Sequence, residues 1–412
     1  MACSLHYVTP ASGGWGVVKT VMLVPESYFL FVCPFACGRH GSIAITEAGL
    51  KDRLSYIFVD QTDIIDGYED LIVRSVPEYL EAIAPARPKV LFIFVSCLDD
   101  LIGTNHEAVL KRLRAEIPDV EFEFGHMNPI TMDSKSPPPI TAQRTMYSLL
   151  RKSGSEPDKA VNLIGNLDDI SPDSELIPFL AASGYETRHI SRYSRYEDFL
   201  RMGSSALNLV IDSKGVYAAK EMEKRLGIPY LFLPVDYSLK GIEDAYARVS
   251  SALGLTHFDM SAYKNAAEKA IKETLDLLGD YPLTVDNSGF MRPYSLAAAL
   301  VSYGFNVEIV FSQKPSGADK AGYEELMRLK PDMKILDPRH IKGIKDRGYL
   351  ADCVAVGSAA AYLTGSVHPA NVTWDAGKYG YMGLVILMEQ IQSAYKEKAD
   401  LRAIIKSQRL VI

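Results

Sequence analysis

The feature that most constrains the fold is a run of six apolar residues, Val90–Val95 (VLFIFV), with no polar residue among them. A strand with one face in water alternates apolar and polar residues, so an unbroken apolar run indicates burial on both faces. A second run of this kind, Tyr28–Cys33 (YFLFVC), ends at Pro34. Such strands are typical of parallel sheets covered by helices on both sides. The chain is therefore expected to contain a doubly wound α/β sheet.

Segments with strand character alternate with segments of helical periodicity along the rest of the chain. The strand-like segments are residues 28–33, 55–59, 90–95, 120–124, 161–164, 185–190, 207–211, 230–233, 283–285, 307–311, 333–336 and 353–356. The helical ones are residues 68–83, 105–116, 143–152, 174–183, 216–226, 261–278, 293–303 and 381–397. This alternation predicts an α/β protein of three Rossmann-like doubly wound domains, with mainly parallel sheets around a central cleft.

The length of 412 residues exceeds what one ordinary hydrophobic core organises, so several domains are expected. One boundary is predicted near residue 155 and another after the long helix that Gly279 closes. The predicted domains are residues 1–155, residues 156–280, and residues 281–412 with a C-terminal helix. Within the first, Ser134–Pro139 (SKSPPP) is expected to be a rigid, extended linker that a helix does not enter.

Charge and composition exclude several classes of function. A net charge of -7 argues against a nucleic-acid partner, because phosphate binding requires clustered excess Lys and Arg. No apolar run approaches the roughly 18 residues that cross a bilayer. The N-terminus lacks the pattern of an export signal, so a cytoplasmic protein without a membrane partner is expected. Five cysteines, an odd number, make a disulfide framework improbable and direct attention to metal or redox chemistry.

Three cysteines lie beside turns rather than inside predicted elements: Cys3, Cys37 and Cys97. Cys37 and Cys97 follow the two buried strands, whose carboxyl ends meet at one edge if the strands are neighbours. Three thiolates from separate loops suit an iron–sulfur cluster, with a fourth ligand from a partner chain or a group other than cysteine. The alternative for each is inert packing, because free cysteine is usually a buried small hydrophobe. That alternative is favoured for Cys33 and Cys353.

Several motifs, in order along essentially the whole chain, resemble the nitrogenase component 1 family. Cys3 precedes a glycine-rich stretch that ends in Trp15 and Gly16. Pro34–Ser42 (PFACGRHGS) is similar to the family's H-G-P-x-x-C-G turn, and Cys97–Gly103 (CLDDLIG) to its C-x-x-x-x-I-G. The later matches are LIGN (163–166), GIPY (227–230), MRP (291–293) and WDAGKYGYMG (374–383).

This resemblance implies that Cys3, Cys37 and Cys97 bind an iron–sulfur cluster, [4Fe-4S] or a larger P-cluster-like form, in the domain of residues 1–155. The cluster would lie at the interface with an identical or homologous second subunit. It would accept electrons from a nitrogenase iron-protein-like, ATP-hydrolysing reductase. Cys33 occupies a place where the family turn usually has a glycine, and an alternative role as ligand stays open for it. No catalytic residue is assigned.

The sequence departs from molybdenum nitrogenase where that enzyme would hold its active-site cofactor. The resemblance places a cofactor cysteine near Ile211–Ser213 and a histidine near Val372, and neither residue type is present there. Residues 140–150 also lack the histidine that would approach dinitrogen. Reduction of dinitrogen is therefore not expected.

Three hypotheses follow. The first is a nitrogenase-like reductase subunit that acts on another hard-to-reduce substrate. For Arg39 and His40, donation to the cluster and a solvated turn at the interface are equally open, and for His368 and Trp374 a structural role is favoured over a place in the cleft. The second is a scaffold on which a metallocofactor is matured. The third, from a different class, is a metal-free binding or glycosyl-transfer protein built from the same Rossmann-type units.

Overall fold

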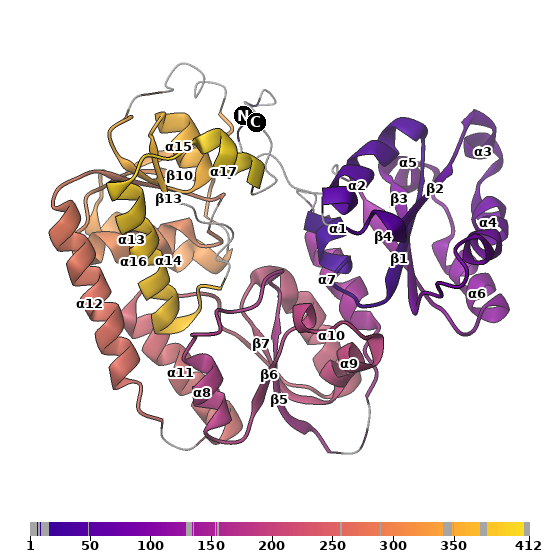
Figure 1. Ribbon diagram of the computed structural model, residues 1–412, viewed down its shortest axis with the longest axis horizontal. Helices are drawn as coiled ribbons and strands as arrows, with labels where there is room; N and C mark the ends of the chain where they lie inside the picture. Colours follow the sequence, from indigo (N-terminus) through magenta and orange to yellow (C-terminus); the bar gives the residue numbers. More distant parts are fainter. Residues whose placement is uncertain are drawn as a thin grey trace. The chain divides into compact units, whose positions relative to one another are not determined.

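The computed structural model describes the chain except for residues 1–5, 7–8, 10–15, 48, 129–133, 135, 153, 155, 256–257, 289, 316, 341–347, 349, 371–376 and 408–412. The chain forms two compact units (Figure 1). One unit comprises Met1–Gly14, Asp168–Thr187 and Leu233–Ile412, and the other comprises Trp15–Leu167 and Arg188–Phe232. The described strands form three sheets, each from consecutive strands of the sequence. The domain limits at residues 155 and 280, and the central cleft, stay predictions.

The first sheet has the strand order β2-β1-β3-β4, and every neighbouring pair is parallel, as predicted. Its strands are β1 (Ser27–Cys33), β2 (Leu54–Phe58), β3 (Val90–Ser96) and β4 (Glu121–Met127). The two unbroken apolar runs are the central strands β1 and β3. Because β2 lies on one side of β1 and the later strands on the other, the order reverses between β1 and β3. Open α/β sheets bind ligands beyond the carboxyl ends of the strands at such a switch point.

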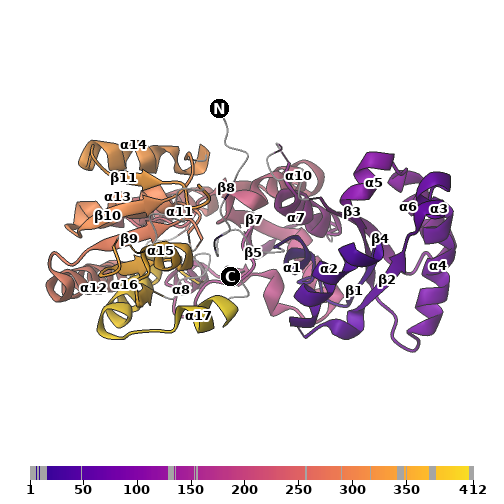
Figure 2. The same cartoon turned by 90° about the horizontal axis from the view of Figure 1, so that it is seen from above.

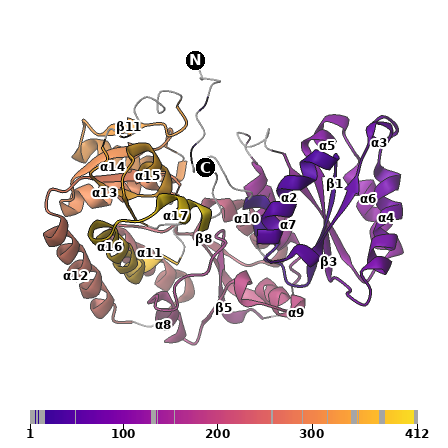
Figure 3. The same cartoon turned by 45° about the horizontal axis from the view of Figure 1, so that its top comes forward.

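Alternate residues of β1 and β3 fill two separate cores. Phe29 and Phe92 stack on one face, with ring centroids 5.9 Å apart, and pack with α1 (Gly16–Val21), α2 (Phe35–Glu47) and α7 (Pro138–Ser148). Leu30 and Ile93 point to the other face, which α4 (Glu69–Ala82) and α6 (His106–Glu116) cover. Figure 1 and Figure 3 show α2 and α7 on the opposite side of the sheet from α4 and α6. Shorter elements complete this region: η2 (Lys51–Arg53), α3 (Gln61–Asp66) and α5 (Cys97–Ile102).

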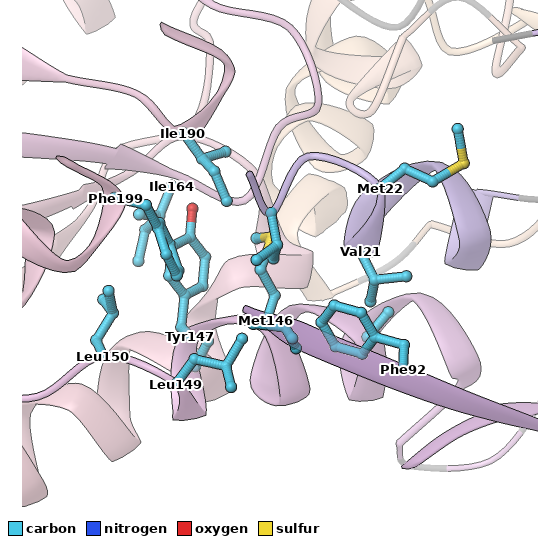
Figure 4. Close-up of a cluster of buried hydrophobic side chains, with 14 of the residues drawn as sticks. Val21, Met22, Phe92, Met146, Tyr147, Leu149, Leu150, Ile164, Ile190 and Phe199 are labelled. Carbon is cyan, nitrogen blue, oxygen red and sulfur yellow. The ribbon is translucent and has the colours of Figure 1, made fainter. Parts of the chain in front are cut away.

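The second sheet repeats the same connectivity, with the order β6-β5-β7-β8. Its strands are β5 (Asp158–Ile164), β6 (Glu186–Arg188), β7 (Ser205–Val210) and β8 (Tyr230–Phe232), accompanied by α8 (Leu176–Ala181), η4 (Ile190–Arg192), α9 (Tyr196–Leu200), η5 (Arg201–Ser204), η6 (Ser213–Gly215) and α10 (Val216–Leu226). One buried cluster runs from Phe92 of the first sheet through Met146 and Tyr147 of α7 to Ile164 and Phe199 (Figure 4). The first two sheets therefore share a continuous core through α7.

The third sheet has the order β11-β10-β9-β12-β13, the Rossmann arrangement, and all its pairs are parallel. Its strands are β9 (Leu283–Asp286), β10 (Val307–Phe311), β11 (Lys334–Leu336), β12 (Val354–Val356) and β13 (His368–Ala370). The helices of this part are α11 (Leu239–Leu253), α12 (Ser261–Leu278), α13 (Pro293–Tyr303), η7 (Gly317–Asp319), α14 (Lys320–Leu329), α15 (Ser358–Thr364), α16 (Gly380–Lys396) and α17 (Leu401–Ser407). Figure 2 shows α14 and α16 on opposite sides of the sheet.

Two local predictions were wrong. The extended linker was predicted to continue to Pro139, but α7 begins at Pro138, with prolines in its first turn. The first helical residues have no intrahelical acceptor for their N–H groups, so proline is tolerated there. Cys37 was predicted in a turn, yet α2 begins at Phe35 and includes it. Helices α11, α14 and α15 were not predicted at all.

Candidate functional site

Cys37 and Cys97 lie in the helices that begin at the carboxyl edge of the first sheet. Val32 of β1 lies opposite Val95 of β3, so the two strands end side by side. Helix α2 starts two residues after β1 and carries Cys37 in its first turn, and Cys97 is the first residue of α5. The two thiols therefore follow the two strands that flank the switch point. Cys3 lies outside the described residues, so its distance from them is not part of the structure.

Exposure divides the four described cysteines into two kinds. Cys37 is exposed and Cys97 is half-buried, whereas Cys33 and Cys353 are buried in hydrophobic cores. Burial, together with the nearby Cys37, raises the pKa of Cys33 to about 12, and burial also raises the pKa of Cys353. The burial of Cys33 and Cys353 agrees with the packing role predicted for them.

Gly38, the residue after Cys37 in α2, has no side chain and therefore leaves room for the aromatic ring of Tyr56. A Cβ atom at this position would lie 2.7 Å from Cε1 of Tyr56 and 3.4 Å from Sγ of Cys33. The backbone of α2 therefore approaches β2 more closely than any other residue type would allow. Of the predicted neighbours Arg39 and His40, only the backbone is described.

Exposed apolar side chains gather on the elements around this edge. Most of the large hydrophobic residues that are exposed in the described part of the chain lie on β2 and on the helices that follow β1, β2 and β3: Phe35, Ile43, Phe58, Ile65, Leu101 and Ile102. We name this set the carboxyl-edge patch. The rings of Phe35 and Phe58 pack against each other with centroids 5.0 Å apart. Exposed apolar side chains that adjoin one another, as Phe35 and Phe58 do, are typical of protein–protein contact sites.

The position at which molybdenum nitrogenase would supply a cofactor cysteine is occupied by a packed turn. After β7, Asp212 accepts a hydrogen bond of 2.8 Å from the backbone N–H of Lys214 and pairs with its Nζ at 2.8 Å. Gly165 has φ +105°, and a Cβ there would lie 2.5 Å from the Asp212 carbonyl oxygen. Asp212 thus stabilises the turn. Val372 and Trp374 lie outside the described residues. His368 has Nδ1 2.7 Å from the carbonyl oxygen of Ala394, which indicates a structural role.

Sequence reasoning missed one group of ligand-type side chains, Asp99, His106 and His126. Each offers one ligand atom, and these atoms all lie within 4.8 Å of one another. Their positions relative to strands β3 and β4 are the feature of the sequence that could have indicated them. His126 lies opposite Val95 in the β3–β4 ladder, while Asp99 and His106 belong to the two helices that follow β3.

Doubly wound parallel sheets, the first with two thiols that follow its adjacent central strands, define a protein of the Rossmann-like α/β class. Residues 15–396 match the sequence model of the family described as nitrogenase component 1 type oxidoreductase. The chain belongs to this family, as the ordered motifs predicted. Membership supports an iron–sulfur cofactor in general and an oxidoreductase type of protein. It leaves the cluster type open.

Two curated relatives share the description "nitrogenase iron-molybdenum cofactor biosynthesis protein NifE". The protein from Clostridium pasteurianum is 24% identical over 248 residues, which cover 56% of this chain and 51% of the relative. The protein from Nostoc sp. is 23% identical over 337 residues, or 76% of this chain and 67% of the relative. The chain thus spans about half to two thirds of the length of these relatives.

Two solved structures share the fold. "Nitrogenase Cp1 at pH 6.5" superposes with a TM-score of 0.71 at 15% identity, covering 96% of this chain and 94% of that chain. "Nitrogenase Cp1 at pH 5" gives a TM-score of 0.58 at 14% identity, covering 96% and 90%. These matches confirm the predicted α/β architecture. None of the described helices is both long and apolar enough to cross a membrane.

Proposed function

We propose that this chain is one subunit of a nitrogenase-like, ATP-dependent reductase, in which Cys37, Cys97 and Cys3 hold an iron–sulfur cluster against a second subunit. The observation that carries the proposal is the position of Cys37 and Cys97 after the adjacent strands β1 and β3, with their thiols accessible. The cluster supplies one-electron chemistry when bound. The chain's own contribution is to present thiolates at a fixed sheet edge and to limit access of water.

The carboxyl-edge patch supports the expectation of a partner subunit. Phe35 precedes Cys37 by two residues and is 78% exposed, and Leu101 follows Cys97 by four residues and is 75% exposed. Covering such side chains with a second protomer removes apolar surface from water and encloses the thiols in the same step. The partner is an identical or homologous chain, and a separate ATP-hydrolysing iron–sulfur protein delivers the electrons.

The substrate is a compound other than dinitrogen. The resemblance to molybdenum nitrogenase requires a cofactor cysteine near Ile211–Ser213 and a histidine near Val372, and both are absent from the sequence. Asp212 is engaged by Lys214 and by its own turn. Without the cofactor cysteine and histidine, the chain lacks the side chains expected to hold a molybdenum-iron cofactor, so the cluster is proposed to relay electrons to an unsaturated substrate instead.

The test of cluster binding is the iron and sulfide content, with the EPR spectrum of the reduced protein, for anaerobically prepared full-length chain. Cys37→Ala and Cys97→Ala are expected to lose most of the iron. Cys353→Ala is the matched control, because that thiol is buried in a hydrophobic core and is expected to leave the iron content unchanged. Wild-type iron content in both Cys37→Ala and Cys97→Ala would refute the assignment.

A second candidate function, a scaffold for metallocofactor assembly, is favoured by the similarity to two iron-molybdenum cofactor biosynthesis proteins. The two functions differ in turnover. With a nitrogenase iron-protein-like reductase, ATP and substrate, a reductase subunit retains ⁵⁵Fe through repeated cycles of reduction and reoxidation. A scaffold transfers its ⁵⁵Fe to an acceptor protein once and then stops. Retention of label with continuing ATP-dependent electron flow supports the reductase, and transfer of label without turnover supports the scaffold.

A further inference from the structure

Asp99 is a buried carboxylate whose two oxygens face Tyr68 and His106. The residue is 1% exposed, and its Oδ1 accepts a hydrogen bond from the hydroxyl of Tyr68, which is itself buried. Its Oδ2 lies 2.6 Å from Nε2 of His106. This contact is within ion-pair distance, although its angles are not those of a hydrogen bond. Buried polar atoms are stabilised by well-aligned polar partners, and an ion between Asp99 and His106 would serve both atoms.

His106 is held in place by aromatic packing. Its ring stacks on Phe124, with centroids 4.4 Å apart, and lies edge-on to the ring of His126 at 4.9 Å. Phe124 and His126 are two residues apart on β4, so both point to the same face of the strand. Strand β4 therefore holds the imidazole of His126, and α6 holds that of His106. Because both elements are rigid, the two rings keep positions from which they can bind the same ion.

His126 has the partner that metal-binding histidines usually have. Its Nδ1 lies 3.1 Å from Oδ1 of Asp100, and Asn128 donates a hydrogen bond to the other oxygen of that carboxylate. A histidine that donates one ring N–H to a carboxylate keeps the lone pair of its other nitrogen free for a metal. With Nδ1 engaged by Asp100, Nε2 of His126 would be the ligand atom.

We propose that Asp99, His106 and His126 bind one divalent first-row transition metal ion of the Zn²⁺ or Fe²⁺ kind. Two imidazoles and a carboxylate are the ligand set of three-residue zinc and non-haem iron sites with open positions. Donor atoms about 2.1 Å from a common ion are about 3–4 Å apart, so binding widens the contact between Asp99 and His106 slightly. The side chains of His106 and His126 are 20% and 31% exposed, which leaves a route for the ion from solvent.

The ion site uses no thiol, but it shares α5 with one of the proposed cluster ligands, because Asp99 follows Cys97 by two residues. Its ligands come from α5, α6 and β4. Replacing the three cysteines therefore allows the ion site to be tested apart from the cluster of the proposed function.

The test is titration with Co²⁺, a spectroscopic probe for Zn²⁺ and Fe²⁺ sites, of full-length protein with Cys3, Cys37 and Cys97 all replaced by serine. The expected result is one bound ion per chain, with visible d–d bands and without the near-ultraviolet bands that thiolate ligands produce. Zn²⁺ is expected to displace Co²⁺, following the order of affinities for nitrogen and oxygen ligands, and Mg²⁺ is expected not to.

Variants of the same protein identify the ligands. His106→Ala and His126→Ala are each expected to weaken Co²⁺ binding by at least about 100-fold, and Asp100→Asn by about 10-fold, as for loss of a residue that orients a ligand. Glu107→Gln is the matched control, because Glu107 is an exposed acid next to His106 on α6. Absence of Co²⁺ binding, thiolate-type bands from the remaining cysteines, or undiminished binding by both histidine variants would overturn the proposal. Should one variant fail to fold, the other and the wild-type spectrum still decide.

Discussion

The hydroxyl of Tyr56 donates a hydrogen bond of 2.8 Å to the carbonyl oxygen of Gly38. A side chain of β2 thereby holds the backbone of α2 one residue after Cys37. The same ring occupies the space that a side chain at position 38 would need. The carboxyl edge of the first sheet is thus fixed by contacts between β2 and α2 as well as by the register of β1 and β3.

Gly38→Ala is expected to displace the turn that carries Cys37. The added methyl group would lie 2.7 Å from the Tyr56 ring, so ring and helix must separate. Overpacking of this kind costs about 1–3 kcal/mol of unfolding free energy, measured by denaturant titration. Iron content is expected to fall as well. Gly317→Ala is the control, because a Cβ there meets no atom within 4 Å. Equal effects of the two substitutions would contradict the prediction.

Tyr56→Phe separates the hydrogen bond from the packing. The ring remains in place. Only the hydroxyl is lost, and with it the hydrogen bond that it donates to the Gly38 carbonyl oxygen. We expect a loss of about 0.5–1.5 kcal/mol in unfolding free energy. Iron content is expected to fall less than in Gly38→Ala, because the turn keeps its place on the ring. A larger loss of iron in Tyr56→Phe than in Gly38→Ala would show that packing does not position the turn.

Alkylation of the cluster-free protein should distinguish the cysteines. At about pH 8, iodoacetamide is expected to modify Cys37 first, because this thiol is exposed and thiolate formation controls the reaction. Cys33 is expected to stay unmodified while the protein is folded, because its pKa is raised to about 12 by burial and by the neighbouring Cys37. Denaturation exposes both. Mass spectrometry of proteolytic peptides gives the order, and early modification of Cys33 would restore it as an alternative cluster ligand.

The carboxyl-edge patch predicts that a charge at Leu101 weakens assembly. Burying a leucine contributes about 1.5–3 kcal/mol, so Leu101→Asp should raise the dissociation constant of the complex by about 10-fold or more. Val367→Asp is the control, since Val367 is a 45% exposed apolar residue elsewhere in the chain. Sedimentation under anaerobic conditions measures both. Equal association of the two variants would place the interface elsewhere.

The first sheet could be predicted from the sequence because the pattern that identifies each central strand lies within that strand. Unbroken apolar runs identified β1 and β3, and the position of two cysteines directly after such strands predicted that Cys37 and Cys97 end up at one edge. The start of α2 could not be predicted in this way. Gly38 and Gly41 each cost helical stability of about 1 kcal/mol relative to alanine, so local propensity favours a turn. Contacts with Tyr56 on another strand override it.

The Asp99, His106 and His126 group was hidden for a different reason. Asp99 follows Cys97 in a short helix and reads as a solvent-exposed acid, because acidic residues are rarely fully buried. Only the tertiary packing against Tyr68 reveals that it is 1% exposed. The register between β3 and β4 brings residues of α5, α6 and β4 close together. This register cannot be predicted from any one of these segments alone.

Tyr246 and Glu175 form a buried hydrogen-bonded pair in the unit that contains the third sheet. Glu175 is fully buried, and its carboxylate accepts hydrogen bonds from the Tyr246 hydroxyl at 2.8 Å and from backbone N–H groups at the start of α16. Tyr246→Phe removes one of these donors and is expected to lower the unfolding free energy by about 1.5–3 kcal/mol, as for a bond to a charged group. Tyr217→Phe, at an exposed tyrosine, should have no effect.

The effect of Tyr246→Phe should also depend on pH. Burial, with Glu175 as the next contribution, raises the pKa of Tyr246 well above 10 in the folded protein. Above about pH 10 the unfolded chain releases this proton while the folded chain keeps it, so the stability of the wild type falls with rising pH. Phenylalanine has no such proton. The difference in unfolding free energy between wild type and Tyr246→Phe should therefore shrink above about pH 10, and a constant or growing difference in denaturant titrations would contradict a buried, protonated Tyr246.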